Sequence, residues 1–282
     1  MSDQLIEKRH AVEAILQQLG HVLIAFSGGV DSTLLAKLAR DALGKERAVA
    51  VTADSPSLAR EDLAEAQRLA RVLDLDHLVI ATRELEDPAY RHNSPARCYA
   101  CKRELFEELE VLAQARAIPA VLYGAITDDM REVRPGHRAA TERGVRAPLQ
   151  EAGFEKWEVR ELAKQLSLPN WDRPQNACLS SRIPHGLEVT EEKLSQVERA
   201  EALLRAQGFY QVRVRHLGAH ARIEVGAEEV ARFNQPALCL DIAQAFSQLG
   251  FETVGVDRRG YRAGGADRPD VDEVSLTSIA TC

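Results

Sequence analysis

The chain has 282 residues, of which 45% are apolar and 28% are charged, as in an ordinary soluble globular protein. Its formal net charge of −7 argues against a general nucleic-acid binder, because such proteins carry a basic surface. No apolar run approaches the length of a membrane span, and the first residues, MSDQLIEKRH, lack the apolar core of a signal peptide. We therefore expect a cytoplasmic protein without nucleic-acid or membrane partners.

The first half of the chain alternates apolar runs of strand length with helical patterns. Strands are predicted over 21–27, 47–53, 77–82 and 120–125, and helices over 32–43, 57–74, 100–117 and 155–167. This alternation predicts an α/β fold with a parallel sheet covered on both faces. Ligands of such sheets bind at the carboxyl ends of the strands.

The pattern changes from Thr190, which has the features of a helix N-cap followed by acidic residues. A helix to Gly208, strands over 210–216 and 221–225, a further helix to about 249 and a strand over 251–257 predict a smaller α+β domain. The expected domains are 1–185 and 186–265, followed by a mobile tail over 266–282.

The segment FSGGVDST lies between the first strand and the first helix of the predicted sheet. Gly28 and Gly29 allow a sharp turn that points backbone N–H groups at an anion, while Ser27, Ser32 and Thr33 add hydroxyl donors. Asp31 would repel a bare phosphate and is best explained as a ligand of Mg²⁺. The alternative is an ordinary Gly-Gly turn capped by Asp31, and the segment is neither a Walker A loop nor a GxGxxG motif.

Three cysteines form a candidate metal-ligand set. Cys98 and Cys101 open a predicted helix as C-x-x-C, and Cys178 lies in PQNACLSSRIPHG, where prolines and a glycine exclude regular structure. Three thiolates would leave one iron of a [4Fe–4S] cluster without a protein ligand. Zinc completed by His185 or His92 is the alternative, and Cys239 and Cys282 are expected to be structural or incidental.

Arg213 and Arg215 share one face of a predicted strand, whereas Val212 and Val214 point to the core. Two adjacent guanidinium groups suit a phosphate. The alternative is a solvated strand face paired with Glu224.

The chain resembles the LarE sulfur transferases of the nickel-pincer nucleotide pathway, which serves lactate racemase maturation, within the superfamily of PP-loop ATP pyrophosphatases. The resemblance spans nearly the whole sequence. It includes SGGVDS, RCYACKRELF, residues 127–149, WDRPQNACLSSRIPHG, VRVRHLG, ARIEV and GYRAGG. It implies a PP-loop domain followed by a smaller domain, and a homo-oligomer.

The resemblance also implies an activity. ATP adenylylates a carboxylate of a carboxylated nicotinic acid mononucleotide, pyrophosphate leaves, and sulfur replaces AMP to give a thiocarboxylate. In one subgroup the loop cysteine gives up its own sulfur, and in the other three cysteines hold a [4Fe–4S] cluster that carries a consumable sulfide. Because this chain has all three cysteines, it resembles the second subgroup, which needs sulfide or a sulfide donor.

Residue roles follow from the same resemblance. ATP and Mg²⁺ would be bound by Ser27, Gly28, Gly29, Asp31, Ser32 and Thr33. The cluster would be bound by Cys98, Cys101 and Cys178, and the substrate phosphate by Arg213, Arg215 and Arg262. The resemblance implies catalytic roles for Cys178, Asp31, Glu201 and Glu224, the two glutamates lying near substrate and a divalent ion. Asp128 and Asp129 follow the fourth strand, where the ligand end of the sheet is expected.

Three other functions compete with this interpretation. A tRNA thiolase shares the loop and the cysteines but needs a basic surface or an RNA-binding module. GMP synthetase shares SGGVDS but does not explain the cysteines. A nucleotide-binding zinc protein without catalysis would bind ATP and not turn it over.

Overall fold

The computed structural model describes residues 3–131, 135–174, 177–262, 265–267 and 272–276. The chain forms two compact units: one contains 1–87 and 96–176, and the other contains 88–95 and 177–282. The boundary expected between 185 and 186 falls inside the second unit, so the loop that carries Cys178 belongs to the second unit.

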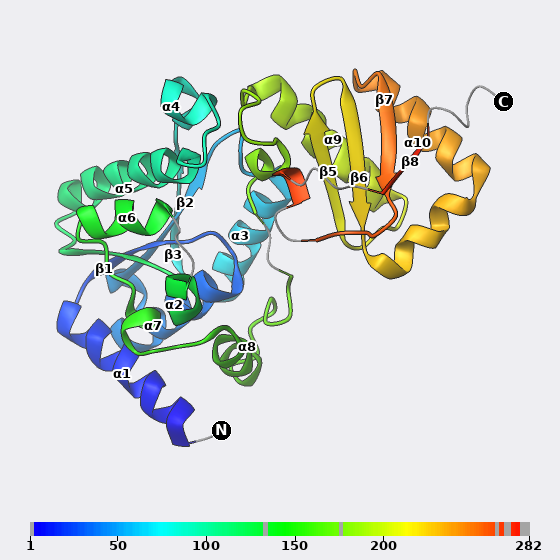
Figure 1. Ribbon diagram of the computed structural model, residues 1–282. Coiled ribbons are helices and arrows are strands. Elements are labelled where there is room, and N and C mark those ends of the chain that lie inside the picture. Colours follow the sequence, from blue (N-terminus) through cyan, green and yellow to red (C-terminus); the bar gives the residue numbers. More distant parts are fainter. Residues whose placement is uncertain (1–2, 132–134, 175–176, 263–264, 268–271, 277–282) are drawn as a thin grey trace. The chain divides into compact units, whose positions relative to one another are not determined.

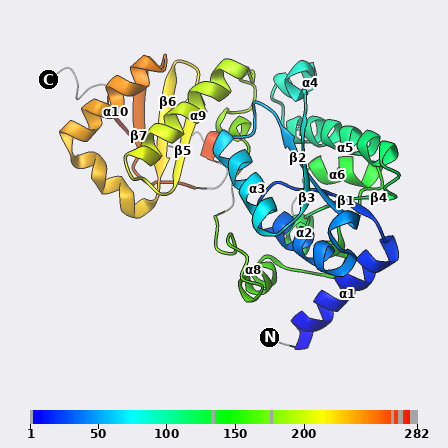
Figure 2. The same ribbon diagram turned by 180° about the vertical axis from the view of Figure 1, so that it is seen from behind.

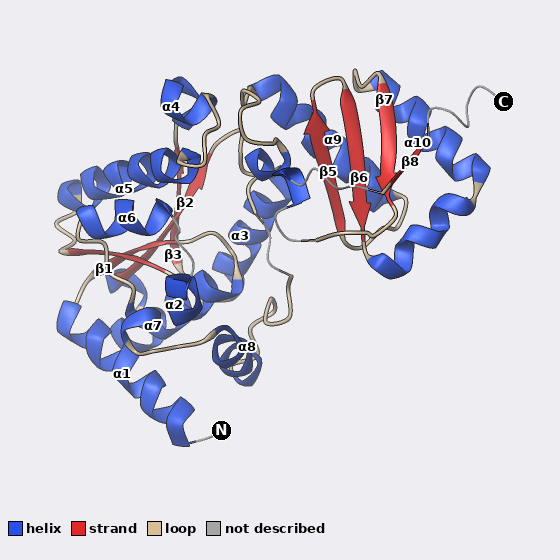
Figure 3. Ribbon diagram, viewed as in Figure 1, coloured by secondary structure: helices blue, strands red, loops and turns tan. Residues whose placement is uncertain are grey.

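The first unit contains a parallel sheet of four strands in the order β3-β2-β1-β4 (Figures 1 and 3). The strands are β1 (Val22–Ala25), β2 (Ala48–Asp54), β3 (Asp76–Ala81) and β4 (Ala120–Tyr123). The helices of this unit are α1 (Asp3–Leu19), α2 (Val30–Leu43), α3 (Arg60–Val72), α5 (Arg97–Ala115), α6 (Pro135–Glu142), α7 (Pro148–Glu151) and α8 (Lys156–Gln165).

Alternation along the strands divides the core of this unit between the two faces of the sheet. Val22 and Ile24 of β1 pack in one cluster with apolar residues of α1, α2, α3 and α8, whereas Leu23 packs with α5 and α6 on the opposite face. Figure 1 shows α5 and α6 on one side of the sheet and α1 and α2 on the other. The predicted parallel sheet covered on both faces is confirmed.

The second unit contains a mixed sheet in the order β5-β6-β7-β8. Its strands are β5 (Val212–Leu217), β6 (His220–Val225), β7 (Thr253–Asp257) and β8 (Glu273–Ser275), and its helices are α4 (Pro88–Arg91), α9 (Glu191–Ala206) and α10 (Pro236–Gln248). Figure 2 shows α9 lying along β5 and β6. Thr190 caps α9 by accepting a hydrogen bond from the Lys193 amide, as the sequence predicts.

One face of this second sheet is apolar and the other is polar. Val212 and Val214 pack with α9 and α10, and Ile223 of β6 joins them, so their position in the core is confirmed. Arg213 and Arg215 therefore lie on the opposite face of the strand.

Strand β8 lies within the segment that the sequence predicts as a mobile tail. Its backbone pairs with β7, and the Leu276 amide donates to the Val254 carbonyl at 2.8 Å. Leu276 is fully buried in the apolar core of the second unit, and this burial holds the segment in place. The rest of the predicted tail after Asp267 lies outside the described residues.

No helix in the described part of the chain combines the length and the apolar character that crossing a membrane requires.

Candidate functional site

The predicted phosphate loop connects β1 to α2 at the carboxyl end of the sheet. Its hydroxyl groups form a local network: the Ser27 and Ser32 hydroxyl oxygens are 3.1 Å apart, and Ser32 Oγ donates to the Gly29 carbonyl at 3.0 Å. Gly29 is the N-cap residue of α2 and makes no side-chain cap hydrogen bond. The helix N-terminus thus keeps its positive dipole end at the turn, where an anion is favoured.

Two glycines permit the close approach of other elements to this loop. Gly28 has φ of +71°, and a Cβ atom there would lie 3.1 Å from Ala66 of α3. A Cβ atom on Gly124, directly after β4, would lie 2.8 Å from the Ser32 amide nitrogen. The loop is therefore packed between α3 and the end of β4 without side chains in between.

Asn170, which lies near the end of the first unit in the sequence, holds the loop in place. This role was not predicted from the sequence. Asn170 Nδ2 donates to the Gly28 carbonyl at 2.9 Å and to Thr33 Oγ1 at 3.0 Å. The side chain is buried. Asn170 thus holds the backbone of the turn and the predicted phosphate-binding threonine in one arrangement.

Asp31 lies beside a lysine that the sequence did not single out. Lys156 Nζ is 2.8 Å from Asp31 Oδ1 and 2.7 Å from Oδ2. Burial raises the pKa of Asp31 above its usual value, although the charge of Lys156 opposes this effect. The carboxylate is thus partly desolvated and is already paired with a cation, Lys156.

Asp128 and Asp129 lie near this group, as the end of the fourth strand predicts. Asp128 Oδ2 accepts a hydrogen bond from the backbone amide of Lys156 at 2.6 Å, and Asp129 Oδ2 accepts one from the Ile126 amide at 3.1 Å. The charge of Asp129 contributes to the raised pKa of Asp31. Asp128 therefore fixes the first residue of α8, from which Lys156 reaches Asp31.

Cys98 and Cys101 lie in the first two turns of α5, three positions apart and hence on one side of the helix. Cys98 is exposed and Cys101 is partly exposed. Among the described cysteines, none forms a disulfide bond. Two accessible thiols with this spacing fit a pair of cluster ligands.

Cys178 lies in the second unit, directly before the short 3₁₀ turn Leu179–Arg182, and it is exposed. The Arg182 guanidinium points into the interior: its Nη1 donates to the carbonyls of Ala177 and Cys178, the latter at 2.9 Å. Only 1% of Arg182 is exposed. Arg182, which follows Cys178 by four positions in the sequence, thus binds the backbone of the cysteine loop.

Glu201, from α9, is the partner of this arginine. Its carboxylate accepts hydrogen bonds from Arg182 Nε at 2.9 Å and Nη2 at 3.1 Å. It also accepts hydrogen bonds from the Val214 amide at 3.1 Å and from Arg205 Nη2 at 3.0 Å. Burial raises the pKa of Glu201, but the charge and hydrogen bonds of Arg182 outweigh it, so the pKa lies below its usual value.

The polar face of the second sheet is buried, so the alternative of a solvated face is wrong. Arg213 and Arg215 are 8% and 4% exposed. The pairing with Glu224 in that alternative is present, because Arg215 Nη2 lies 2.7 Å from Glu224 Oε2. Burial lowers the pKa of Arg213 to about 10, and the charges of Arg182 and Arg215 add to this effect.

The remaining predicted phosphate ligand, Arg262, forms an ion pair with Asp257 at 2.8 Å. Tyr261 directly precedes this arginine, and the centroid of its ring lies 5.3 Å from the guanidinium carbon of Arg213. Arg213, Arg262 and Tyr261 thus belong to one end of the second unit. His185, the proposed fourth zinc ligand, has its Nδ1 atom 3.1 Å from Asp267 Oδ2.

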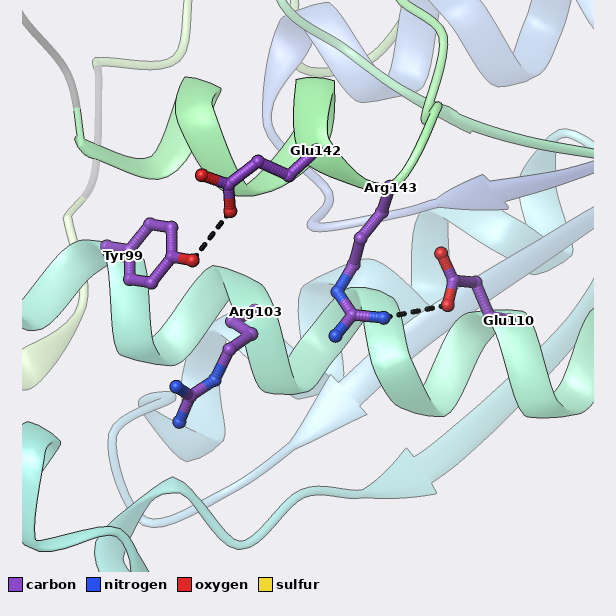
Figure 4. Close-up of a pocket in the computed structure, with 5 residues that line it drawn as sticks. All are labelled: Tyr99, Arg103, Glu110, Glu142 and Arg143. Atoms are coloured by element: carbon purple, nitrogen blue, oxygen red, sulfur yellow. Dashed lines mark hydrogen bonds and ion pairs between the residues drawn. The ribbon is translucent and has the colours of Figure 1, made fainter.

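A cavity of about 450 Å³ lies between α5 and α6, and one of its lining residues, Tyr99, lies between Cys98 and Cys101 in the sequence. Figure 4 shows its lining residues, with the Tyr99 hydroxyl donating to Glu142 at 2.6 Å and Arg143 Nη1 to Glu110 at 2.8 Å. Arg103 is paired with Asp87. Except for Arg103, the charged groups of this cavity bind other residues that line it, and no predicted ligand-binding residue is among the lining residues.

The sequence is similar to proteins of known families. The family model described as NAD synthase matches residues 8–128, which include the phosphate loop and the C-x-x-C pair. An uncharacterized protein of Synechocystis is 47% identical over 89% of this chain and 93% of its own length. The pyridinium-3,5-bisthiocarboxylic acid mononucleotide synthase of Lactiplantibacillus plantarum is 37% identical over 92% of this chain and 94% of its own length. The chain belongs to the LarE family of these synthases.

A more distant relative of this LarE-family chain is a subunit of the glutamine-hydrolyzing GMP synthase of Methanocaldococcus jannaschii. It is 30% identical over 69% of this chain and 66% of its own length. The family of ATP-using enzymes predicted from SGGVDS is therefore confirmed.

Sequence reasoning found the loop and the cysteines of the LarE-family chain but missed Lys156 and Asn170. Both act on the loop from positions more than 120 residues further along the chain. Asn170 had one signal, because it follows Leu168-Pro169 at a helix end, where a polar residue is free to turn towards the sheet. Lys156 had none.

Proposed function

We propose that this protein uses ATP to adenylylate a carboxylate of a carboxylated nicotinic acid mononucleotide and then converts that carboxylate into a thiocarboxylate. The observation that carries the first half is the loop between β1 and α2, where backbone amides, two serine hydroxyls and a partly buried aspartate surround a helix N-terminus. We infer the class of substrate from the name of the Lactiplantibacillus plantarum relative.

The loop supports cleavage between the α- and β-phosphates. A turn that binds the terminal phosphates stabilises pyrophosphate as the leaving group. A substrate carboxylate oxygen then attacks the α-phosphorus, the bond to pyrophosphate breaks, and an acyl adenylate forms. Asp31 would hold Mg²⁺ on the phosphates, and the ion would neutralise their charge.

The second half exchanges AMP for sulfur. A sulfur nucleophile attacks the carbonyl carbon of the acyl adenylate, the bond to the AMP oxygen breaks, and the products are a thiocarboxylate and AMP. Cys98, Cys101 and Cys178 would hold a [4Fe–4S] cluster, which supplies an iron without a protein ligand for one extra sulfide. The exposure of Cys98 and Cys178 supports this role.

The polar face of the second sheet supports binding of the substrate phosphate. Arg213, Arg215 and Arg182 are buried and repel one another, which contributes to the lowered pKa of Arg213. A phosphate dianion beside Arg213 would offset this repulsion and accept charge-assisted hydrogen bonds. Arg262 and Glu224 complete the proposed group: Arg262 as a further phosphate ligand and Glu224 as the acid that orients Arg215.

The test is the stoichiometry of ATP cleavage by the purified protein. We expect AMP and pyrophosphate, formed only when the carboxylated mononucleotide is present, and a thiocarboxylate when sulfide is also supplied. Nicotinic acid mononucleotide without the second carboxylate is the matched control. Formation of ADP, or cleavage at the same rate without an acceptor, would contradict the proposal.

A further inference from the structure

The loop that carries Cys178 is held in place by polar side chains of the second unit. Asn93 Nδ2 donates to the carbonyls of Pro184 and Leu187, both at 2.8 Å, and Arg215 Nη1 donates to the Ser181 carbonyl at 3.2 Å. Buried backbone carbonyls require such partners. The position of this loop therefore depends on a few polar side chains.

Arg182 is the contact that reaches the cysteine itself. Its Nη1 binds the Ala177 and Cys178 carbonyls, while its Nε and Nη2 bind Glu201. The planar guanidinium thus joins two groups in fixed directions, which a lysine ammonium cannot do. The backbone of Cys178 is bound from the interior, and the residue remains exposed.

Glu201 connects this arginine to the rigid part of the second unit. A carboxylate has about four acceptor positions, and in Glu201 they are taken by two Arg182 nitrogens, the Val214 amide of β5 and Arg205. Only 1% of Glu201 is exposed. The carboxylate is therefore saturated with donors, and it anchors Arg182 to both α9 and β5.

We propose that Arg182, anchored by Glu201, is the positioning residue that fixes the backbone of Cys178 and thereby places its thiol for sulfur transfer. The role of Arg182 in sulfur transfer rests on the proposed function, whereas the effect of Arg182 on the cysteine loop does not. Glu201 then acts on the cysteine loop through Arg182.

The experiment compares Arg182→Lys with the wild type by hydrogen exchange and by kinetics. The Ser181 and Ile183 amides, which donate to the carbonyls of Cys178 and Ser180, should exchange about tenfold faster or more, the scale of a lost hydrogen bond to a charged group. Amides of α10 should be unchanged. Arg182→Lys should lower the kcat of thiocarboxylate formation at least tenfold, while the single-turnover rate of pyrophosphate release, which precedes sulfur transfer, stays constant.

Arg205→Lys is the matched control, because Arg205 donates to the same carboxylate from one turn further along α9. It should change neither readout. If Arg182→Lys does not fold, Glu201→Asp, which withdraws the anchor by one methylene, should show the same two changes.

Unchanged amide exchange in Arg182→Lys, or equal losses in single-turnover pyrophosphate release and in thiocarboxylate formation, would overturn the positioning role. A different result is also informative: the wild type releases no pyrophosphate, but Arg182→Lys still exchanges its loop amides faster. This result would overturn the proposed function and leave the role of Arg182 in holding the loop in place.

Discussion

Lys156 of α8 forms an ion pair with Asp31 of the phosphate loop, and its Nζ atom lies within 2.8 Å of both carboxylate oxygens. The side chains are 34% and 26% exposed, so solvent screens part of their attraction. The pair connects the first turn of α2 to the first residue of α8. A Mg²⁺ ion that binds Asp31 would compete with this ammonium for the carboxylate oxygens, because the two cations repel each other.

Asp31→Asn should abolish pyrophosphate release and leave the fold intact. The free energy of unfolding should change by no more than about 1 kcal/mol, because the pair is partly exposed and burial already disfavours the Asp31 charge. Pyrophosphate release and urea unfolding measure the two effects. Asp41→Asn breaks the exposed Lys37–Asp41 pair on the same helix and should affect neither. Normal turnover in Asp31→Asn would refute the role of this carboxylate.

Arg213→Ala should weaken binding of the substrate nucleotide by about 1.5–3 kcal/mol, the usual contribution of a charged hydrogen bond. Arg213 is the sharper choice, because Arg215→Ala would also leave the buried Glu224 with a weakened ion pair. Calorimetric titration with each ligand separates the effects, and ATP affinity should be constant. Arg232→Ala, which removes a contact with the Phe209 ring, is the control. Equal losses for both ligands would contradict a phosphate site at Arg213.

Cys98→Ser and Cys101→Ser should each lose the brown colour of a cluster and sulfur transfer together, while pyrophosphate release continues. The reason is that three thiolates are needed to hold the cluster. Absorption spectra and product analysis of anaerobically purified protein measure both effects. Cys239→Ala should retain both, because this buried thiol donates to the Phe233 carbonyl at 3.0 Å.

The same samples distinguish a cluster from a sacrificial cysteine. Intact-protein mass spectrometry after turnover should show Cys178 unchanged. A dehydroalanine at this position, in protein whose Cys98→Ser variant remains active, would show that Cys178 gives up its own sulfur.

The second unit should lose stability in mild acid through His216. Burial lowers the pKa of this histidine from 6.5 to about 4, and Lys193 adds to the effect. Between pH 6.5 and 4 the unfolded chain therefore binds more protons than the folded one. The free energy of unfolding therefore decreases as the pH is lowered from 6.5 to 4, by up to about 3 kcal/mol. Denaturant unfolding at pH 7 and pH 4.5 measures it.

His216→Gln should show a smaller fall between these pH values, because glutamine does not titrate and can still donate to Gln196, as His216 Nε2 does at 2.8 Å. His10→Gln, on an exposed position of α1, should retain the full fall. An identical pH dependence in His216→Gln would show that other groups cause it.

The parallel sheet, the loop and the strand faces could be predicted because their signals are local. Apolar runs of strand length and the glycine pair are visible within a few residues, and Val212 and Val214 follow a period of two. The orientation of Arg182 could not be predicted, because its proximity to Cys178 in sequence indicates a charge near the sulfur, whereas Glu201 draws the guanidinium inward. The Lys156–Asp31 contact likewise depends on the packing of α8.

The tail illustrates a second limit. Residues 272–276 are too few for the alternation of Val274 and Leu276 with polar residues to identify a strand. Their structure comes from pairing with β7 and from the burial of Leu276. A short edge strand of this kind gains its stability from tertiary contacts rather than from its own propensity. Composition alone therefore underestimates the extent of the second unit.

The chain passes between its two compact units after Asp87, Pro95 and Asn176, so the second unit is assembled from two separate stretches of sequence. During synthesis, residues 88–95 leave the ribosome well before the carbonyls that Asn93 binds, the first of which lies 90 positions later. A gene fragment that begins at residue 177 would lack Asn93, and one that ends at 176 would carry it without the carbonyls of Pro184 and Leu187 that it binds. Recombination between related genes can therefore exchange the second unit only together with much of the first, so the two units are inherited as one piece.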